Sequence, residues 1–569
     1  MLYCRILNGK TEKTECSPEF ELSCELLVAG LGTAGAMAAI SGAESGLDTV
    51  GVEVFGSMGG IGTVGGIWDY SWGNPGGRFE ELDLRAQKLC DSAFMHTGTE
   101  DSEIGSRFIH GAAKAYVLED TARKAGCRLL LNTSVTGVFV EDGRIVGVEC
   151  FDASGRFNIA AKVVIDSTGD QIVVRSAGFP TRTESDAARM YFTRTRAVIA
   201  GRLVRNSPVC CGQRTSALRD DFRLSEILVD VGSKPPFLCE RYSANGRMVE
   251  VAEMPCFRDA ERIFGIETLE LIPYLRGEFT GEPLFFAFAP IDHVGGDIVS
   301  ASYGQKLWWL GCKMRGFGLN VPVTAGMMIP EGSQNLIVAD RGISLGDELI
   351  GCVRMKKDME RLGEAAAAIA YFAVRDKLPV YEVESHAVAA RLLESGFRGD
   401  SEPVISAIQG FMEWTPVKPP TTNEELGELL ASGNYGAAVV FALGGEFSPD
   451  SEVESMLGVE KTRFGAAALL GILGIFGRKP PCEVTAILRE AAAKPLTDRT
   501  LSVDKLPQTA AIWILGELCD RDSLGLLRTL ETKYANYPDE SVEKTVSRLC
   551  LAAAESIMGE TQKTLRAGV

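Results

Sequence analysis

Gly30-Leu31-Gly32-Thr33-Ala34-Gly35 closes the apolar run of residues 26–29 and opens a run of small residues, which predicts a buried strand, a tight turn and a helix. In such a G-x-G-x-x-G pattern the first glycine permits the turn, and the second lets the backbone approach a pyrophosphate. The third glycine lets the helix pack closely on the strand. Because N–H groups at a helix N-terminus attract phosphates, Thr33 and Ala34 are also expected to contact the ligand. The stretch therefore predicts a dinucleotide-binding site.

An acidic residue follows at the place where this kind of site needs one. Glu53 ends a second predicted strand, residues 49–54, and stands 23 positions after Gly30. A carboxylate there can accept hydrogen bonds from ribose hydroxyls, and it would repel a 2′-phosphate. The pattern alone does not distinguish NAD from FAD.

A second glycine cluster comes directly after this acidic residue. Residues 56–66 contain six glycines, and glycine is needed where the backbone passes close to a bulky ligand or takes a positive φ. Linkers are usually richer in serine and proline, whereas this segment also holds apolar residues. We interpret the loop, with Gly59 and Gly60, as a cofactor contact; a flexible surface linker is the alternative.

A further buried strand is predicted after a β-hairpin. The runs 135–140 and 145–148 flank a turn, and the run 161–166 then ends at the corner Thr168-Gly169-Asp170. We expect this corner to return the chain to the nucleotide and to contact it.

Bulk properties narrow the class of protein. A chain of 569 residues is too long for one core, so two or three domains are expected. The formal charge of −18 argues against nucleic acid or an anionic membrane surface as a partner and leaves a small molecule as the default substrate. We find no leader pattern and no apolar stretch long enough to span a bilayer, so we expect a cytoplasmic protein. The 15 cysteines form no C-x-x-C pair, and no metal site is predicted.

From residue 26 to about residue 397 the chain resembles the FAD-dependent oxidoreductases that have a glutathione-reductase type of FAD domain. The closest branch by these motifs is the one with the heterodisulfide reductase A-like flavoproteins. The most specific stretches are residues 335–344 (NLIVADRGIS), 351–354 (GCVR) and 362–366 (LGEAA). Relatives in this branch carry iron–sulfur clusters, but the cysteine runs that would hold one are missing here.

The resemblance implies FAD as the cofactor and assigns roles to residues of the second motif. Asp340 would hydrogen-bond the ribityl chain. A helix that starts near Gly351, with Cys352 and Val353, would aim N–H groups at the N1 and O2 edge of the flavin. This agrees with simple electrostatics, because a reduced flavin carries negative charge near N1.

Residues 180–330 interrupt the FAD-binding pattern with aromatics, prolines and strand-like runs, and we interpret them as the substrate domain. His293 lies there in a polar corner and is a candidate proton acceptor; a structural histidine is the alternative. Arg341 and Arg354 flank the second flavin motif and are candidates to bind a substrate carboxylate. Their alternative is an internal salt bridge to Asp347 or Glu348.

One pattern occurs four times after the proline-rich loop 415–420. A small residue and an alanine are followed, after four positions, by an apolar residue and a glycine, and the glycines are 30, 42 and 43 residues apart. Small residues allow close helix packing, and periods near 40 resemble HEAT-type repeats. We interpret the tail as a short α-solenoid that binds a protein partner or self-associates and is dispensable for flavin binding. An ordinary helical bundle is the alternative.

The predicted fold class is α/β, with a Rossmann-like FAD-binding domain, an inserted α+β substrate domain and an all-α C-terminal repeat domain. The predicted segments are an N-terminal extension (1–22), the FAD-binding domain (23–179 and 331–376), the substrate domain (180–330), a helical extension and linker (377–420), and a HEAT-like helical domain (421–569).

The leading functional hypothesis is an FAD-dependent oxidoreductase that transfers a hydride between the flavin and a small organic substrate. One alternative is a flavin electron-transfer subunit of a heterodisulfide-reductase-like complex. A second is a non-catalytic flavoprotein scaffold that binds a protein partner through its helical repeats.

Overall fold

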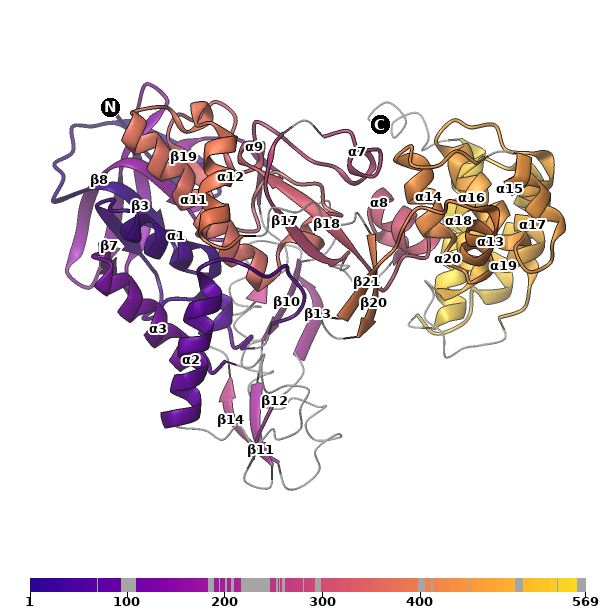
Figure 1. Ribbon diagram of the computed structural model, residues 1–569, viewed down its shortest axis with the longest axis horizontal. Helices are drawn as coiled ribbons and strands as arrows, with labels where there is room; N and C mark the ends of the chain where they lie inside the picture. Colours follow the sequence, from indigo (N-terminus) through magenta and orange to yellow (C-terminus); the bar gives the residue numbers. More distant parts are fainter. Residues whose placement is uncertain are drawn as a thin grey trace. The chain divides into compact units, whose positions relative to one another are not determined.

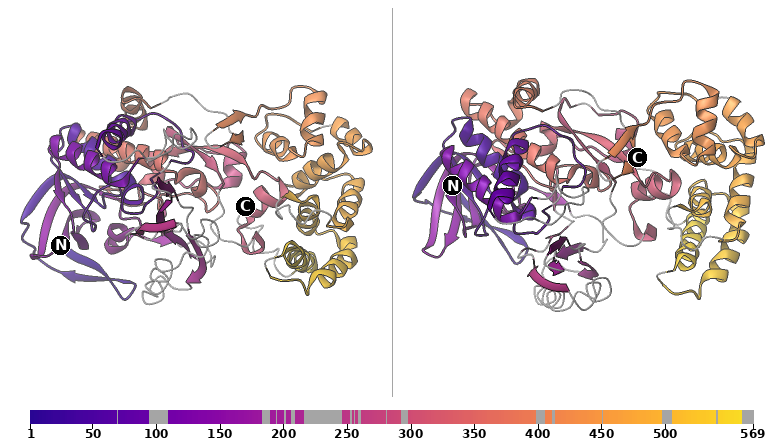
Figure 2. Two further views of the ribbon diagram at one scale, coloured as in Figure 1. Left: turned by 90° about the horizontal axis from the view of Figure 1, so that it is seen from below. Right: turned by 60° about the horizontal axis from the view of Figure 1, so that its bottom comes forward.

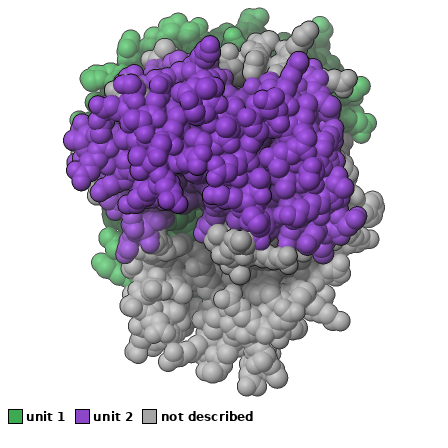
Figure 3. Space-filling view, turned by 90° about the vertical axis from the view of Figure 1, so that its right-hand side faces the viewer, with its two compact units in different colours: residues 1–269, 280–295, 320–402 green, residues 270–279, 296–319, 403–569 purple. Residues whose placement is uncertain are grey.

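The computed structural model divides the chain into two compact units, which Figure 3 shows in different colours. Unit 1 contains Met1–Leu269, Thr280–Gly295 and Asn320–Glu402, and unit 2 contains Glu270–Phe279, Gly296–Leu319 and Pro403–Val569. The structure describes residues 1–559 apart from 69, 94–108, 183–188, 194, 200–201, 206–208, 216–245, 252–253, 255, 258–260, 280, 292–297, 398–404, 411–412, 450, 497–504 and 540.

A nine-stranded mixed sheet is the centre of unit 1. Its strands run in the order β2-β1-β6-β7-β8-β3-β4-β5, and β19 also pairs with β8. The strands are β1 (Leu2–Leu7), β2 (Lys10–Glu15), β3 (Leu22–Ala29), β4 (Thr49–Val52), β5 (Arg128–Leu130), β6 (Ser134–Glu141), β7 (Arg144–Asp152), β8 (Gly155–Asp166) and β19 (Leu336–Val338). The predicted N-terminal extension therefore supplies two strands of this sheet.

The strands β5, β4, β3, β8 and β19 are parallel to one another, and β6, β7 and β8 form antiparallel hairpins. The predicted strand at residues 26–29 is the buried end of β3, where no side chain is exposed. Parallel strands of this kind are covered on both faces, which explains their continuous apolar sequence. This arrangement confirms the predicted Rossmann-like FAD domain.

Two helices pack against each other beside this sheet (Figure 1). The helix α1 (Thr33–Glu44) follows the glycine turn, and α11 (Lys356–Asp376) follows the second flavin motif. A Cβ on Gly363 would lie 2.0 Å from the carbonyl oxygen of Ala34, so the two backbones touch where that glycine stands. Among the described residues, unit 1 also contains α2 (Phe79–Ala93), α3 (Gly111–Lys124), α4 (Ile172–Ala177), α9 (Ala325–Met328), α10 (Ile350–Val353) and α12 (Ser385–Glu394).

The predicted substrate segment adds smaller antiparallel sheets to unit 1. One sheet has the order β13 (Val209–Thr215), β10 (Arg189–Thr193), β15 (Cys256–Phe257). A second has the order β12 (Arg202–Arg205), β11 (Thr195–Ile199), β14 (Gly246–Val251). A third pairs β16 (Arg262–Ile263) with β9 (Thr181–Arg182). The strand-like run at residues 283–289 is confirmed as β17 (Pro283–Pro290), a sheet neighbour of β18 (Phe317–Thr324).

Unit 2 is mainly helical, as predicted for the tail; its last helices appear in orange to yellow in Figures 1 and 2. Its elements are α7 (Leu271–Leu275), α8 (Tyr303–Lys306), β20 (Ile405–Gly410), β21 (Glu413–Pro416), α13 (Asn423–Ala431), α14 (Tyr435–Leu443), α15 (Ser451–Ser455), α16 (Arg463–Ile475), α17 (Cys482–Ala493), α18 (Pro507–Glu517), α19 (Leu524–Tyr534) and α20 (Val542–Met558). Within the described residues we find no helix whose length and apolar character would suffice for a membrane crossing.

The tail does not pack only on itself. The π-helical turn Leu307–Gly311 belongs to the same unit, and a Cβ on Gly311 would lie 2.5 Å from the Trp513 ring. The Tyr435 hydroxyl donates to the carbonyl of Gly311 at 2.8 Å. The two units therefore group the chain differently from the five predicted segments. The segment expected to be a helical extension and linker, 377–420, also contains the strands β20 and β21.

Candidate functional site

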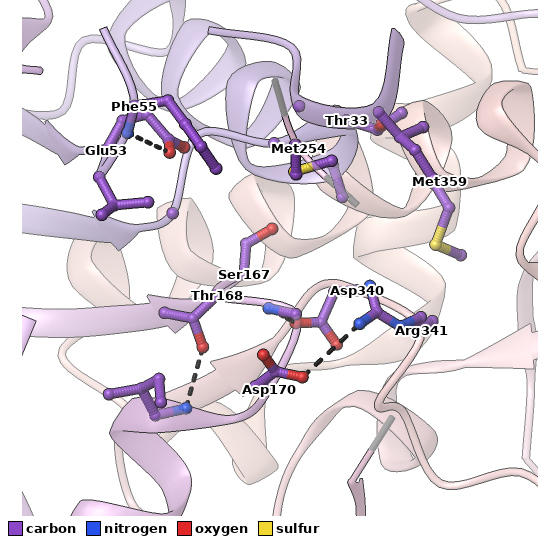
Figure 4. A pocket seen from close by; sticks show the side chains of 18 of the residues that line it. Thr33, Glu53, Phe55, Ser167, Thr168, Asp170, Met254, Asp340, Arg341 and Met359 are labelled. Atoms are coloured by element: carbon purple, nitrogen blue, oxygen red, sulfur yellow. Dashed lines mark hydrogen bonds and ion pairs between the residues drawn. The ribbon is translucent and has the colours of Figure 1, made fainter. Parts of the chain in front are cut away.

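A cavity of about 510 Å³ lies in unit 1 where the parallel strands end (Figure 4). Gly30 follows β3, Glu53 follows β4, the corner 167–170 follows β8, and Asp340 follows β19 closely; all of them line the cavity. The carboxyl ends of parallel strands form the usual ligand-binding edge of such a sheet. The predicted cofactor residues that line the cavity are Gly30, Gly32, Thr33, Ala34, Glu53, Gly60, Thr168, Gly169, Asp170 and Asp340.

The three glycines of the first motif meet different constraints. Gly30 has a φ of +84°, and a Cβ there would lie 2.4 Å from the carbonyl oxygen of Ser167. A Cβ on Gly35 would lie 1.9 Å from the oxygen of Gly30, so Gly35 closes the turn without lining the cavity. Around Gly32 a Cβ would meet no atom within 4 Å. The space over Gly32 is therefore free for a ligand, and a side chain there would enter it.

The Glu53 carboxylate is held by backbone N–H groups. Its Oε2 accepts a hydrogen bond from the Leu31 N–H at 2.6 Å, and its Oε1 accepts one from the Phe55 N–H at 3.0 Å. Burial raises the pKa of the carboxyl, and these backbone hydrogen bonds lower it. Each oxygen keeps a lone pair for a further donor.

Asp340 joins the two corners at the ends of β8 and β19. Its Oδ2 accepts from the Gly169 N–H at 2.7 Å, and its Oδ1 accepts from Gln171 Nε2 and the Gly342 N–H, both at 2.6 Å. Burial, with a smaller contribution from the charge of Asp166, raises the pKa of the Asp340 carboxyl to about 7. These bonds fix the corner whose backbone lines the cavity.

Arg341 lines the cavity and pairs with Asp170 at 3.6 Å, as Figure 4 shows. An internal salt bridge to Asp347 or Glu348 was the alternative role predicted for Arg341 and Arg354. Asp347 pairs with Arg262, which is 1% exposed. Arg354, the second candidate arginine, also lines the cavity. The candidate proton acceptor His293 lies outside the described residues.

The helix predicted to start near Gly351 corresponds to a short helix, and a longer helix follows it. Gly351, Cys352 and Val353 lie in the short helix α10, are buried and do not line the cavity. The long helix α11 starts at Lys356, after the extended Met355. Its first turn supplies cavity residues that the sequence analysis missed, Lys356 and Met359.

Gly59 also does not line the cavity. It has a φ of +99°, and its N–H donates to the carbonyl of Leu31 at 2.8 Å, so it places the glycine loop against the first turn. Its neighbour Gly60 lines the cavity, and a Cβ on Gly60 would lie 2.8 Å from the Cα of Gly32. The other lining residues that were not predicted are Val52, Val54, Phe55, Ile61, Thr133, Ser134, Val135, Ser167, Ile172 and Met254. Several of them directly follow β4 and β5, which is the signal that could have identified them.

The cavity has two distinct sides. Figure 4 shows Glu53 and Phe55 on one side and Met359 and Arg341 on the other. The space over Gly32 is open. The acidic residue Glu53 is suited to bind a ribose, and the basic residues Arg354 and Lys356 lie at or just before the first turn of α11. The residues present thus fit FAD, whose pyrophosphate links an adenosine to a flavin.

Comparisons with known proteins agree with this geometry. The family model described as FAD dependent oxidoreductase matches residues 25–220 and 236–392, which is more than half of the chain. No curated protein matches the chain.

Solved structures that are similar to this chain include the following three proteins. A geranylgeranyl bacteriochlorophyll reductase-like protein from Thermoplasma acidophilum is 14% identical, with 82% of this chain and 99% of that chain covered and a TM-score of 0.37. The p-nitrophenol 4-monooxygenase from Pseudomonas putida is 11% identical, with 80% and 100% covered and a TM-score of 0.34. The anhydrotetracycline hydroxylase from Streptomyces rimosus is 11% identical, with 79% and 76% covered and a TM-score of 0.35. By the family match, the chain belongs to the FAD-dependent oxidoreductases, and its cofactor is FAD.

Proposed function

We propose that this oxidoreductase transfers a hydride between FAD and a small organic substrate that carries an anionic group. The observation that carries the proposal is the pair Arg341 and Arg354, which line the same cavity as the first glycine motif. A guanidinium binds a carboxylate through two parallel hydrogen bonds, which orients it as well as attracting it. When bound, FAD supplies the ring that accepts or donates the hydride.

The proposed placement of the cofactor follows the cavity. The backbone at Gly30 and Gly32 would lie under the pyrophosphate, with Thr33 and Ala34 at the helix N-terminus, and Glu53 would accept from the adenosine ribose. The corner of Thr168, Gly169 and Asp170, tied to Asp340, would follow the ribityl chain. The first turn of α11, in place of residues 351–353, would face the flavin ring.

Arg341 and Arg354 would hold the anionic group of the substrate beside the flavin. His293 would accept the proton that leaves a substrate hydroxyl, a role that rests on its sequence context and on the pKa range of histidine.

The test is anaerobic bleaching of the flavin absorbance by a panel of hydroxy acids, polyols, sugars and enoates. We expect an acidic compound to reduce the flavin in the absence of other proteins. Arg354→Lys should slow this reduction at unchanged FAD content, because lysine keeps the charge but lacks the planar fork. Arg375→Lys, in the last turn of α11 and outside the cavity lining, is the control. If no compound of the panel fully reduces the flavin, the result would favour an electron-transfer subunit or a scaffold.

From the motifs at residues 335–366 we also propose that the chain belongs to the heterodisulfide reductase A-like branch. We further propose that the tail is a HEAT-like repeat that binds a protein partner or self-associates. Support for the repeat comes from the packing of its motif residues. A Cβ on Gly516 would lie 2.8 Å from that of Ala553, which is the alanine of the next repeat. Sedimentation of the purified chain across a concentration series tests self-association.

A further inference from the structure

Lys356 is the first residue of α11, lines the cavity and has two anchors. Its Nζ donates to the carbonyl of Ile67 at 2.6 Å. The same ammonium lies 4.1 Å from the centre of the Tyr70 ring, over its face. A cation in this position is attracted by the ring and loses the freedom of a surface lysine. The structure thus holds a positive charge at a defined place beside the cavity.

The Tyr70 hydroxyl is held by a buried cluster of charged side chains. Its hydroxyl donates to the Glu360 carboxylate, with both oxygens at 2.9 Å. Lys114 lies 3.0 Å from Glu360 and 3.3 Å from the Tyr70 hydroxyl, and it also pairs with Asp83. The Glu360 and Lys114 side chains are 4% and 7% exposed. These groups come from α2, α3, α11 and the loop before α2.

The charges of this cluster give Lys356 a role beyond packing. The two carboxylates of Asp83 and Glu360 are met by one ammonium group within the cluster, that of Lys114. Lys356 and Glu360 stand four residues apart on one face of α11, so Lys356 supplies the second positive charge. Removing one partner from a buried set of opposite charges is strongly destabilising, so we expect the set to stay together.

The positions of the other lining residues indicate which end of FAD Lys356 would face. Met359 also lines the cavity and stands one helical turn after Lys356, on the side opposite Glu53 and Phe55 (Figure 4). If Glu53 binds the adenosine ribose, the other end of FAD reaches the first turn of α11. Lys356 then lies at the flavin end.

We infer that Lys356 is a cationic contact of the flavin ring and that Tyr70, Glu360, Lys114 and Asp83 form a buried chain that positions its ammonium group. A fixed positive charge there favours the reduced flavin, which carries negative charge. The midpoint potential of the bound flavin is therefore higher than it would be without Lys356. The inference rests on the proposed placement of FAD and not on the identity of the substrate.

The first test compares midpoint potentials of FAD-loaded variants, measured against a redox dye with a chemical reductant. Lys356→Met should shift the potential to a more negative value, and Lys356→Arg should stay close to the parent. Lys357→Met is the matched control, because this neighbouring lysine does not line the cavity. An unchanged potential in Lys356→Met at full FAD content would overturn the inference. Since no substrate is used, failure of the proposed hydride transfer would leave this result unaffected.

The second test separates positioning from simple stabilisation. Tyr70→Phe keeps the ring under the ammonium, whereas Tyr70→Leu removes it. We expect Tyr70→Leu to move the potential in the same direction as Lys356→Met, and Tyr70→Phe, which keeps the ring and loses only the hydroxyl bond to Glu360, to move it less. In the Lys356→Met background Tyr70→Leu should then cause no further shift, as expected for two residues acting as one unit. An equal shift by Tyr70→Leu in both backgrounds would show that the ring does not act through Lys356.

Discussion

Glu53 and Asp340 show how a buried acid can serve a ligand site in two ways. Glu53 was expected to meet a ribose, and it lines the cavity while its oxygens accept backbone hydrogen bonds at 2.6 and 3.0 Å. Asp340 uses three protein donors at 2.6 to 2.7 Å, so its first role is to shape the corner beside the cavity. A sequence motif identifies the position of such an acid but not the number of protein donors around it.

A residue outside the site gives a prediction about pH. Glu364 in α11 is buried, and its Oε1 accepts from the Arg78 N–H at 2.8 Å. Burial, with a smaller contribution from the charge of Glu360, raises the pKa of this carboxyl to about 8. Because the folded pKa lies above the unfolded value, the native state binds the extra proton. This contribution to stability is complete below the unfolded pKa near 4.5 and is lost as the pH rises through about 8.

We therefore expect Glu364→Gln to flatten the loss of stability between pH 6 and pH 9. Glutamine keeps the Oε1 acceptor and cannot ionise. The free energy of unfolding, measured by urea denaturation at both pH values, checks this. Glu394→Gln, on an exposed face of α12, is the control. A parent protein that is equally stable at both pH values would contradict the argument.

At the scale of elements, the central strands were predictable because their sequences are short, continuous apolar runs with turn residues on either side. The start of α11 was not. Met355, which precedes the helix, makes no side-chain cap, and neither Gly nor Pro marks the break between α10 and α11. The sequence predicted a helix from near Gly351, and the cavity residues Lys356 and Met359 of the following helix were missed.

The contact between α1 and α11 gives a prediction at the same scale. A Cβ on Gly363 would lie 2.0 Å from the Ala34 oxygen, so Gly363→Ala must push the two helices apart. We expect a loss of about 1–3 kcal/mol in the free energy of unfolding, the usual cost of overpacking. FAD affinity should fall as well, since Ala34 lines the cavity.

The control is Gly427→Ala in α13, where a Cβ would meet nothing within 4 Å. This change should leave stability equal or raise it by up to about 1 kcal/mol, because alanine favours the helix. Equal effects of the two substitutions in thermal and urea unfolding would refute the close contact.

At the scale of the whole molecule, the tail is bound into unit 2 together with parts of the chain that precede it. A chain that ends at residue 420 would keep residues 296–319 and lose their partner Trp513. The buried Trp308 and Leu310, both 0% exposed, belong to that segment. We therefore expect the truncated chain to aggregate, contrary to the dispensable tail that the sequence suggested. If gel filtration shows a soluble monomer with bound FAD, the tail is dispensable for flavin binding and this expectation is wrong.

Sequence alone could not have revealed this grouping. The pieces 270–279 and 296–319 lie more than 80 residues before residue 403, where the rest of unit 2 begins, and pairing over such distances leaves no local pattern. The FAD motifs were accessible because each places its glycines and acid within a few residues of one strand end.

The most direct measurement is FAD content after substitution of Gly32. Its φ is −65°, which valine can adopt, and no atom lies near its absent Cβ, so Gly32→Val should fold as the parent does. The new side chain would occupy the space assigned to the pyrophosphate. We expect the parent to be yellow and to release FAD on denaturation, and the variant to have the same circular dichroism spectrum but to take up no FAD. A Gly32→Val protein that binds FAD as tightly as the parent would contradict the placement of the cofactor in this cavity.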